Sequence, residues 1–338
     1  MLININIHAL GQASGGGSVN LAKRDCHGID TAPTSAETWR GTHKQSYGSM
    51  TSATKKIIVV VGATGKQGGS VVRTFVRDAS LTSEWQVRGI TRDPSSARAA
   101  ELANLEVEVV GASLGSVSDL ESAFSNATAV FVVTSFLSAT QDSETQARVK
   151  GEGIDPFIAA AETETGWAFN AAIAASRTPT LQRFVFSALP PVTRLSGGQL
   201  PLVYPFDSKW AAVERIEAEL PALWAKTSLL LVGYYHSNIQ PEYNATRGRA
   251  ELVGPLQADT SVAFIDADVS TGPYARALIV DEPAGTRLVA FDEYRSMAAT
   301  AEMLTRATGR EVVYVEQTAE EVLARNGPNG QILLQVST

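Results

Sequence analysis

The sequence predicts a doubly wound α/β fold, in which helices cover both faces of a parallel sheet, with a smaller α/β lobe at the C-terminal end. The first observation is that short apolar runs alternate with amphipathic segments of roughly 10–15 residues, which indicates βαβ units. The second is a glycine-rich turn directly after the first of these runs. The third is the composition, 44% hydrophobic and 19% charged over 338 residues, which is that of a globular chain.

Six strands and five helices are expected in the main sheet and on its faces. The first strand, 57–61, is a continuous β-branched run, as in a strand buried on both faces. The other strands follow at 86–91, 107–110, 129–134, 183–187 and 228–232. The helices are expected over 67–79, 93–104, 116–125, 164–176 and 207–220. The residues interpreted as starting helices are the N-caps Asp93, Ser116 or Ser118, and Asp207, with Pro94 at the first helical position.

Two segments interrupt the alternation, and the pattern changes beyond residue 232. Residues 136–163 are too long for a simple connection and show no clear period, apart from a helical turn at 154–161. Residues 189–206 are rich in proline and glycine, as in a loop over a site. The C-terminal lobe is expected to contain strands at 262–265, 287–291 and 311–315, and helices at 270–280, 296–308 and 318–325.

Composition excludes several classes of protein and of site. With Cys26 as its one cysteine, the chain has no disulfide framework and no thiolate zinc cluster, and no metal site is expected. The net charge of −7 argues against direct nucleic-acid binding. No apolar run approaches the ~20 residues that cross a bilayer, so no membrane association is expected. A cytoplasmic location follows, or a nuclear one for a regulator.

The glycine-rich turn is the most specific signal in the chain. Gly62, Gly65 and Gly68 follow the first strand and open a helix, in the context that a dinucleotide-binding Rossmann turn requires. The second glycine lets backbone N–H groups approach a pyrophosphate, and the helix N-terminus faces its negative charge. The alternative is a plain strand-to-helix turn that uses glycines for steric reasons. The sequence therefore divides into a disordered extension at 1–54, a dinucleotide-binding domain at 55–235 and a smaller substrate or partner lobe at 236–338.

The end of the second strand favours NADP(H) over NAD(H). An NAD binder needs a carboxylate there for the ribose hydroxyl, but this strand ends in Thr91 and Arg92. A guanidinium can bind a 2′-phosphate through two parallel hydrogen bonds. Ser95 and Ser96 could donate to the same phosphate. The alternative is that Arg92 only pairs with the neighbouring Asp93.

These motifs resemble the NmrA-like family of atypical short-chain dehydrogenase/reductase proteins. The likeness rests on the string GATGKQG and on residues 60–72, 91–94, 132–136, 180–190, 206–209 and 233–238, and it covers about 55–325. The resemblance implies NADP(H) contacts at the following residues: Gly62, Ala63, Thr64, Gly65, Lys66, Gln67, Gly68, Arg92, Asp93, Pro94, Ser95, Ser96, Gly111, Ala112, Thr134, Ser135, Phe136, Lys209, Tyr234, Tyr235, His236, Ser237 and Asn238.

The sequence also departs from the family pattern. Ala112 stands where relatives usually have an aspartate, and the segment after Phe136 is longer than usual. Family members often continue with another helix beyond Arg325, so a shortened C-terminal end is expected here.

The residues for hydride-transfer chemistry are incomplete. The broader superfamily needs a serine, and a tyrosine four residues before a lysine. Ser187 and Lys209 suit two of these roles, but Pro205 stands where the tyrosine should be, which leaves Tyr204, Tyr234 or a water as proton donor. Two functions are consistent with this pattern. One is an NADP(H)-dependent oxidoreductase acting on a small carbonyl or alcohol in fungal secondary metabolism. The other is a non-catalytic NADP sensor that binds a transcription factor.

Overall fold

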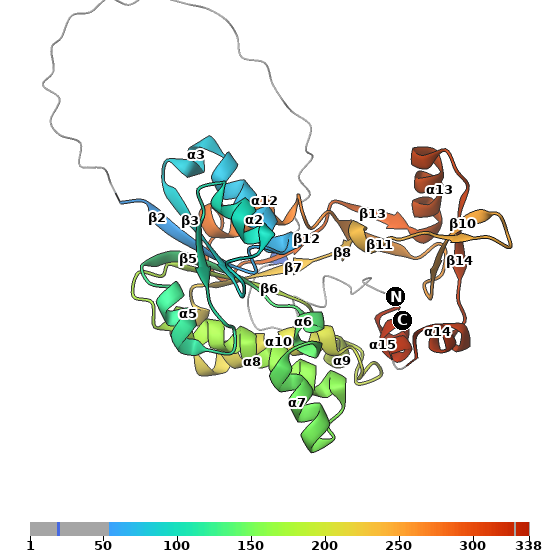
Figure 1. Ribbon diagram of the computed structural model, residues 1–338, viewed down its shortest axis with the longest axis horizontal. Coiled ribbons are helices and arrows are strands. Elements are labelled where there is room, and N and C mark those ends of the chain that lie inside the picture. The colour runs from blue at the N-terminus through green and yellow to red at the C-terminus, as the bar shows by residue number, and fades with distance from the viewer. Residues whose placement is uncertain (1–18, 21–53, 328, 338) are drawn as a thin grey trace, which may run out of the picture.

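A computed structural model describes residues 19–20, 54–327 and 329–337 of the chain. The extension expected at 1–54 lies outside the described residues, apart from 19–20 and 54. The described residues form a large central sheet with helices on its two faces, and a smaller lobe beside one edge of this body (Figure 1).

The central sheet has eight strands in the order β1-β12-β7-β6-β5-β2-β3-β4, and every neighbouring pair is parallel. The strand order reverses at β2, which lies between β3 and β5, and ligands of such sheets bind where the order reverses. The bounds are β1 (Val19–Asn20), β2 (Lys56–Val61), β3 (Trp85–Thr91), β4 (Glu108–Gly111), β5 (Ala127–Val133), β6 (Arg183–Ala188), β7 (Thr227–Val232) and β12 (Arg287–Ala290).

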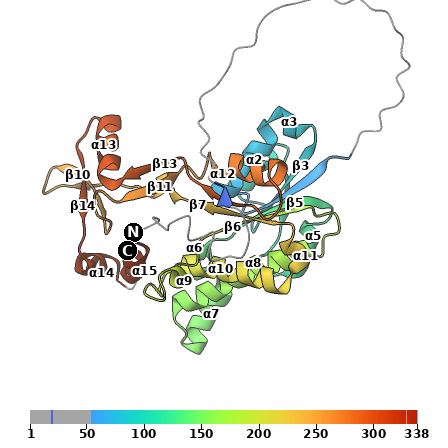
Figure 2. The ribbon, with the colours of Figure 1, turned by 180° about the vertical axis from the view of Figure 1, so that it is seen from behind.

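Helices form a layer on each face of this sheet, as the views from both sides show (Figures 1 and 2). One layer contains α2 (Lys66–Arg77), α3 (Ala79–Thr82) and α12 (Thr271–Arg276); the other contains α5 (Val117–Ala123), α8 (Pro156–Ser176), α10 (Tyr204–Glu219) and α11 (Pro221–Trp224). Strand β2 is buried on both sides, because Ile58 and Val60 pack into one core cluster while Val59 and Val61 pack into the other. This double burial explains the continuous apolar run of β2.

The segment 136–163 is helical, which corrects the expectation of an irregular connection. It forms α6 (Phe136–Thr140), α7 (Ser143–Glu152) and the first turns of α8, which begins at Pro156 and not at Glu164. The Asp155 side chain caps α8 by accepting from two backbone N–H groups, and Pro156 follows at the first helical position. The missing period has a physical cause: α8 buries small alanines on several sides, so it has no single apolar stripe.

Two expected helix starts are also wrong. The helix after β3, α4 (Ala97–Ala103), is capped by Ser96, whose hydroxyl accepts from Ala99 N at 3.3 Å; Asp93 and Pro94 lie in the turn before it. Helix α10 begins at Tyr204, so Asp207 lies in its first turn and binds Thr193 instead of capping the helix. The proline-rich segment 189–206 contains the short helix α9 (Val192–Leu195). Ser116 caps α5 as expected.

The smaller lobe holds two three-stranded sheets, β14-β10-β9 and β13-β11-β8, around a third core cluster. Not all of residues 236–338 belong to it. Helix α12 packs against α2, and β12 joins the central sheet beside β7. A further helix, α15, follows α14, so the chain continues in helical form beyond Arg325. The bounds are β8 (Tyr234–Tyr235), η1 (His236–Asn238), β9 (Glu242–Asn244), β10 (Arg249–Gly254), β11 (Ser261–Ile265), η2 (Ala277–Asp281), β13 (Glu293–Ser296), α13 (Met297–Thr308), β14 (Val312–Glu316), α14 (Ala319–Asn326) and α15 (Asn329–Ser337).

Candidate functional site

The glycine-rich turn joins the carboxyl end of β2 to the N-terminus of α2. Gly62 has a φ of +77°, which an L side chain rarely adopts. A Cβ added to Gly68 would lie 2.1 Å from the carbonyl oxygen of Gly62, so α2 approaches the end of β2 too closely for any side chain. The first turn of α2 has no side-chain cap and no acidic residue. The first N–H groups of α2 are therefore not taken up by a side-chain cap, as an anion-binding helix end requires.

Arg92 lies directly after β3 and is exposed. The alternative that it only pairs with Asp93 is wrong. The Asp93 carboxylate instead accepts from the Ser95 backbone at 2.9 Å and from the Ser95 hydroxyl at 2.5 Å, and these bonds hold the pKa of Asp93 below its usual value. No carboxylate within the described ranges lies at ion-pair distance from Arg92.

The turn after β4 packs against the turn after β3. A Cβ on Gly111 would lie 2.8 Å from the Pro94 ring, so the two turns can pack this closely only because residue 111 has no side chain. Ala112 is buried, and its N–H donates to the Thr91 carbonyl at 3.1 Å. The carboxyl ends of β2, β3 and β4 thereby form one continuous edge.

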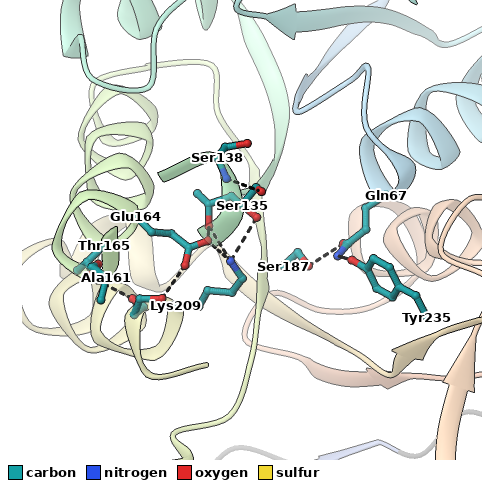
Figure 3. Close-up of polar contacts among 11 residues, drawn as sticks. Gln67, Ser135, Ser138, Ala161, Glu164, Thr165, Ser187, Lys209 and Tyr235 are labelled. Carbon is teal, nitrogen blue, oxygen red and sulfur yellow. Dashed lines mark hydrogen bonds and ion pairs between the residues drawn. The ribbon is translucent and has the colours of Figure 1, made fainter. Parts of the chain in front are cut away.

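Lys209 is buried in a polar cluster at the carboxyl end of β5 (Figure 3). Its ammonium group donates to the Thr134 carbonyl at 3.2 Å and to the Thr134 hydroxyl at 3.0 Å, and it forms an ion pair with Glu164. Glu164 is fully buried and also accepts from Thr134 at 2.9 Å and from Ser208 at 2.6 Å. Glu164 thus neutralises the charge of Lys209. The hydrogen bonds fix the Lys209 ammonium group between α8 and the end of β5.

Glu164 is a site residue that the sequence analysis did not select. The signal was present, because Glu164 lies four residues from both Ala160 and Ala168 on the buried face of α8. A lone carboxylate on an otherwise apolar helix face requires a buried cation as its partner. To place Glu164 on this buried helix face, one must know that α8 begins at Pro156. The sequence pattern predicted a helix only from residue 164 onward.

A second polar chain joins Ser187, Gln67 and Tyr235 (Figure 3). The buried Ser187 hydroxyl donates to the Gln67 side-chain oxygen at 2.7 Å, and the Gln67 amide nitrogen donates to the Tyr235 hydroxyl at 2.5 Å. Burial raises the pKa of Tyr235, although the Gln67 hydrogen bond opposes this rise. The chain therefore connects the end of β6, the first turn of α2 and β8.

The two tyrosines expected as proton donors have other contacts. Tyr204 stacks on Phe157 at 6.3 Å between ring centroids, and Tyr234 packs edge-on against Phe264 at 5.7 Å. Tyr204 lies five residues before Lys209 on α10, which turns it well away from the lysine around the helix axis. Tyr235 is the tyrosine that is linked to Ser187, through the side chain of Gln67.

The remaining residues expected to contact the cofactor have the following positions and partners. Ser135 caps α6 ahead of the half-buried Phe136, and the exposed Lys66 forms an ion pair with Asp268 at 3.2 Å. The buried Ala63 and the partly buried Thr64 lie within the glycine-rich turn, and the exposed Ser237 and Asn238 lie on η1.

His236 faces a cavity inside the smaller lobe. The cavity measures about 270 Å³, and its walls are mostly apolar. The His236 ring stacks on Phe264, and its Nε2 atom lies 3.3 Å from the Glu293 carboxylate without a hydrogen bond of good geometry. The lining residues are His236, Ile239, Phe264, Glu293, Arg295, Thr300, Met303 and Leu304. Across the described helices, none combines the length and apolarity that crossing a bilayer requires.

Comparison with solved structures places this arrangement among NAD(P)-binding folds. NmrA, a negative transcriptional regulator, solved in complex with NADP, superposes with a TM-score of 0.64 at 22% identity, over 84% of this chain and 81% of that one. A quinone oxidoreductase of Escherichia coli, solved with NADPH, gives a TM-score of 0.57 at 21% identity, over 83% and 87%. These likenesses show the fold.

Curated relatives are described as NmrA-like family domain-containing oxidoreductases. The protein lnbB of Aspergillus flavus is 24% identical over 82% of this chain and 80% of its own length. The protein cpsB of Aspergillus campestris is 43% identical, but the match spans only 25% of this chain and 24% of cpsB. The match to ptmS of Penicillium ochrochloron is as short, at 40% identity over 23% of each chain. A model of the NmrA-like family matches residues 54–335, and the chain therefore belongs to the NmrA-like family.

Proposed function

We propose that this protein is an NADP(H)-dependent oxidoreductase that acts on a small-molecule carbonyl or alcohol. The observation that carries the proposal is the contact between Gly68 and the Gly62 carbonyl, where a Cβ would lie 2.1 Å away. This contact brings the uncapped N-terminus of α2 to the edge of the sheet, at the position where a pyrophosphate binds in folds of this class.

The surrounding residues suit NADP(H) in particular. Arg92 has no carboxylate partner among the described residues, so its guanidinium suits a 2′-phosphate, and neither Thr91 at the end of β3 nor Arg92 after it is acidic. Lys209, held by Thr134 and Glu164, lies at the end of β5, on the far side of β2 from Arg92. When bound, NADPH supplies a hydride; the protein binds and orients it and excludes water.

The relatives and the smaller lobe support a small-molecule substrate. The curated relatives carry the description oxidoreductase, and NmrA and the E. coli quinone oxidoreductase were solved with NADP and NADPH. The smaller lobe also holds a cavity of about 270 Å³, whose lining combines four apolar side chains with His236, Glu293, Arg295 and Thr300.

Replacing Gly68 by alanine tests the proposal, with Gly69 as matched control. In Gly68→Ala the added methyl group meets backbone atoms, so the turn must open and NADPH binding should weaken at least 10-fold. In Gly69→Ala the methyl group meets the flexible end of Arg73 at 3.0 Å and the Ala63 carbonyl oxygen at an ordinary contact distance of 3.4 Å, so affinity should stay within about twofold. Quenching of protein fluorescence by NADPH measures both. Equal affinities for the two variants would contradict the proposal.

A sensor that binds a regulatory protein is the second candidate. It is favoured by Lys209, which is held in an ion pair with no tyrosine four residues before it. NmrA itself is described as a negative transcriptional regulator. Consumption of NADPH in the presence of aldehydes and ketones discriminates the two: turnover supports the oxidoreductase, and tight binding without turnover of any acceptor supports the sensor.

A further inference from the structure

The search for a proton donor leads to Tyr235 and not to either tyrosine expected from the sequence. A carbonyl that accepts a hydride becomes an alkoxide, so its reduction needs a proton at the oxygen. Tyr204 stacks on Phe157 and Tyr234 on Phe264. Tyr235 lies at the end of a hydrogen-bonded chain that starts from Ser187 and passes through Gln67 in the dinucleotide-binding turn (Figure 3).

The direction of the hydrogen bonds decides what the Tyr235 hydroxyl can do. Ser187 donates to the Gln67 oxygen at 2.7 Å, which turns the amide nitrogen toward Tyr235. That nitrogen donates to the phenolic oxygen at 2.5 Å. Tyr235 is therefore an acceptor in this contact, and its own O–H remains available to another acceptor. A donor on the phenolic oxygen also stabilises the phenolate that remains after the proton leaves.

We propose that Tyr235 is the general acid of carbonyl reduction and that Ser187 and Gln67 are its positioning residues. The inference rests on the proposed oxidoreductase function. The carbonyl carbon gains a C–H bond from the hydride that the bound cofactor supplies, and the C=O double bond becomes a single bond. The oxygen gains the Tyr235 proton as the phenolic O–H bond breaks. The carbonyl is reduced, the cofactor is oxidised, and the phenolate takes a proton back from water.

The electrostatics of the site favour reduction over alcohol oxidation. Burial raises the pKa of Tyr235 above the usual value of a phenol, which favours the protonated form. The cation that lowers the tyrosine pKa in the broader superfamily is engaged elsewhere here, since Lys209 pairs with Glu164. Tyr235 is then a poor base for oxidising an alcohol and a suitable acid for protonating an alkoxide.

Two hydride acceptors separate a chemical role of Tyr235 from a structural one. Nitrobenzaldehyde needs a hydride and a proton, whereas the malachite green cation needs only a hydride to become its neutral leuco form. In Tyr235→Phe the rate of nitrobenzaldehyde reduction should fall about 100-fold or more. The rate of dye reduction, measured at saturating NADPH, should fall by no more than about threefold, because this reaction needs no proton.

Tyr314→Phe is the matched control, because it removes another buried hydroxyl, which donates to the Leu256 carbonyl at 2.7 Å. In Tyr314→Phe the rates of nitrobenzaldehyde reduction and of dye reduction should both equal those of wild type. Ser187→Ala should lower aldehyde reduction more than dye reduction, because it releases the Gln67 amide. An equal loss of both rates in Tyr235→Phe, or no loss, overturns the role of Tyr235. So does a loss of aldehyde reduction in Tyr234→Phe alone.

A spectroscopic titration tests the inference without turnover. The ultraviolet difference between wild type and Tyr235→Phe isolates one tyrosinate, which should form above pH 10 and shift to lower pH when NADP⁺ is added. A tyrosinate signal that NADP⁺ does not move overturns the role of Tyr235. Failure of the wild-type protein to bind NADPH overturns the proposed function itself, and the two failures are thus distinguishable.

Discussion

We propose that Arg92 determines the choice between the two nicotinamide coenzymes. Its neighbour Asp93 is occupied by Ser95, so the guanidinium lies at the end of β3 without a carboxylate partner among the described residues. A planar guanidinium binds a phosphate through two parallel, charge-assisted hydrogen bonds. With an uncharged ribose hydroxyl it can form only a weaker hydrogen bond.

Arg92→Ala should therefore weaken NADPH binding by about 1–3 kcal/mol, the usual range for a charge-assisted pair. The affinity for NADH should change little, because NADH has no 2′-phosphate. Fluorescence titration with the two coenzymes measures the ratio of the Kd values. A similar loss of affinity for both would show that Arg92 does not discriminate between them.

The Lys209–Glu164 pair illustrates a buried ion pair that needs both of its members. Glu164 is fully buried, so removal of its charge leaves the ammonium group of Lys209 without compensation in the interior. Glu164→Gln should lower the free energy of unfolding by about 3–5 kcal/mol.

The double variant Glu164→Gln/Lys209→Met tests this explanation in urea unfolding. It should be more stable than Glu164→Gln alone, because no uncompensated charge remains in the interior. Strictly additive losses from the two substitutions would contradict the ion-pair account.

At the scale of elements, the sequence pattern predicted six of the eight strands of the central sheet and the glycine-rich turn after the first of them. The strand near 287–291 was expected in the smaller lobe, but β12 joins the central sheet. The run at 57–61 and the three glycines are local signals, and β2, α2 and the close contact at Gly68 agree with them. The start of α8 could not be predicted, because a helix that buries alanines on several sides has no amphipathic period.

The site was predictable where a contact is local and not where it depends on tertiary structure. Arg92 follows its strand directly, so its position could be inferred from the chain order. The Tyr235–Gln67 bond joins residues 168 positions apart, and nothing in the sequence distinguishes Tyr235 from Tyr234. Only the alternation of β8 decides which ring faces α2 and which faces Phe264.

At the scale of the whole molecule, the C-terminal half completes the central sheet. A Cβ on Gly272 of α12 would lie 2.4 Å from the Ser70 carbonyl oxygen of α2, so the backbones of these helices are in close contact. Asp268 forms ion pairs with Lys66 at 3.2 Å and with Arg73 at 3.9 Å, and β12 pairs with β7 from Arg287 to Ala290. The body built on the central sheet therefore does not end at residue 235.

A fragment of residues 54–235 should consequently fail to fold cooperatively. It exposes the edge of β7 and the face of α2 that α12 covers. A fragment of residues 54–291 keeps both contacts and should show more native circular dichroism and a sharper thermal transition. Cooperative unfolding of the shorter fragment with a similar Tm would contradict this account.

The central claim is that the N-terminus of α2 and the Arg92 guanidinium together bind NADP(H). Isothermal titration calorimetry of the full chain with NADPH and with NADH tests this claim most directly. We expect one site per chain and an affinity for NADPH at least 10-fold higher than for NADH, which corresponds to about 1.4 kcal/mol. Absence of binding heat with both coenzymes, or tighter binding of NADH, would contradict it.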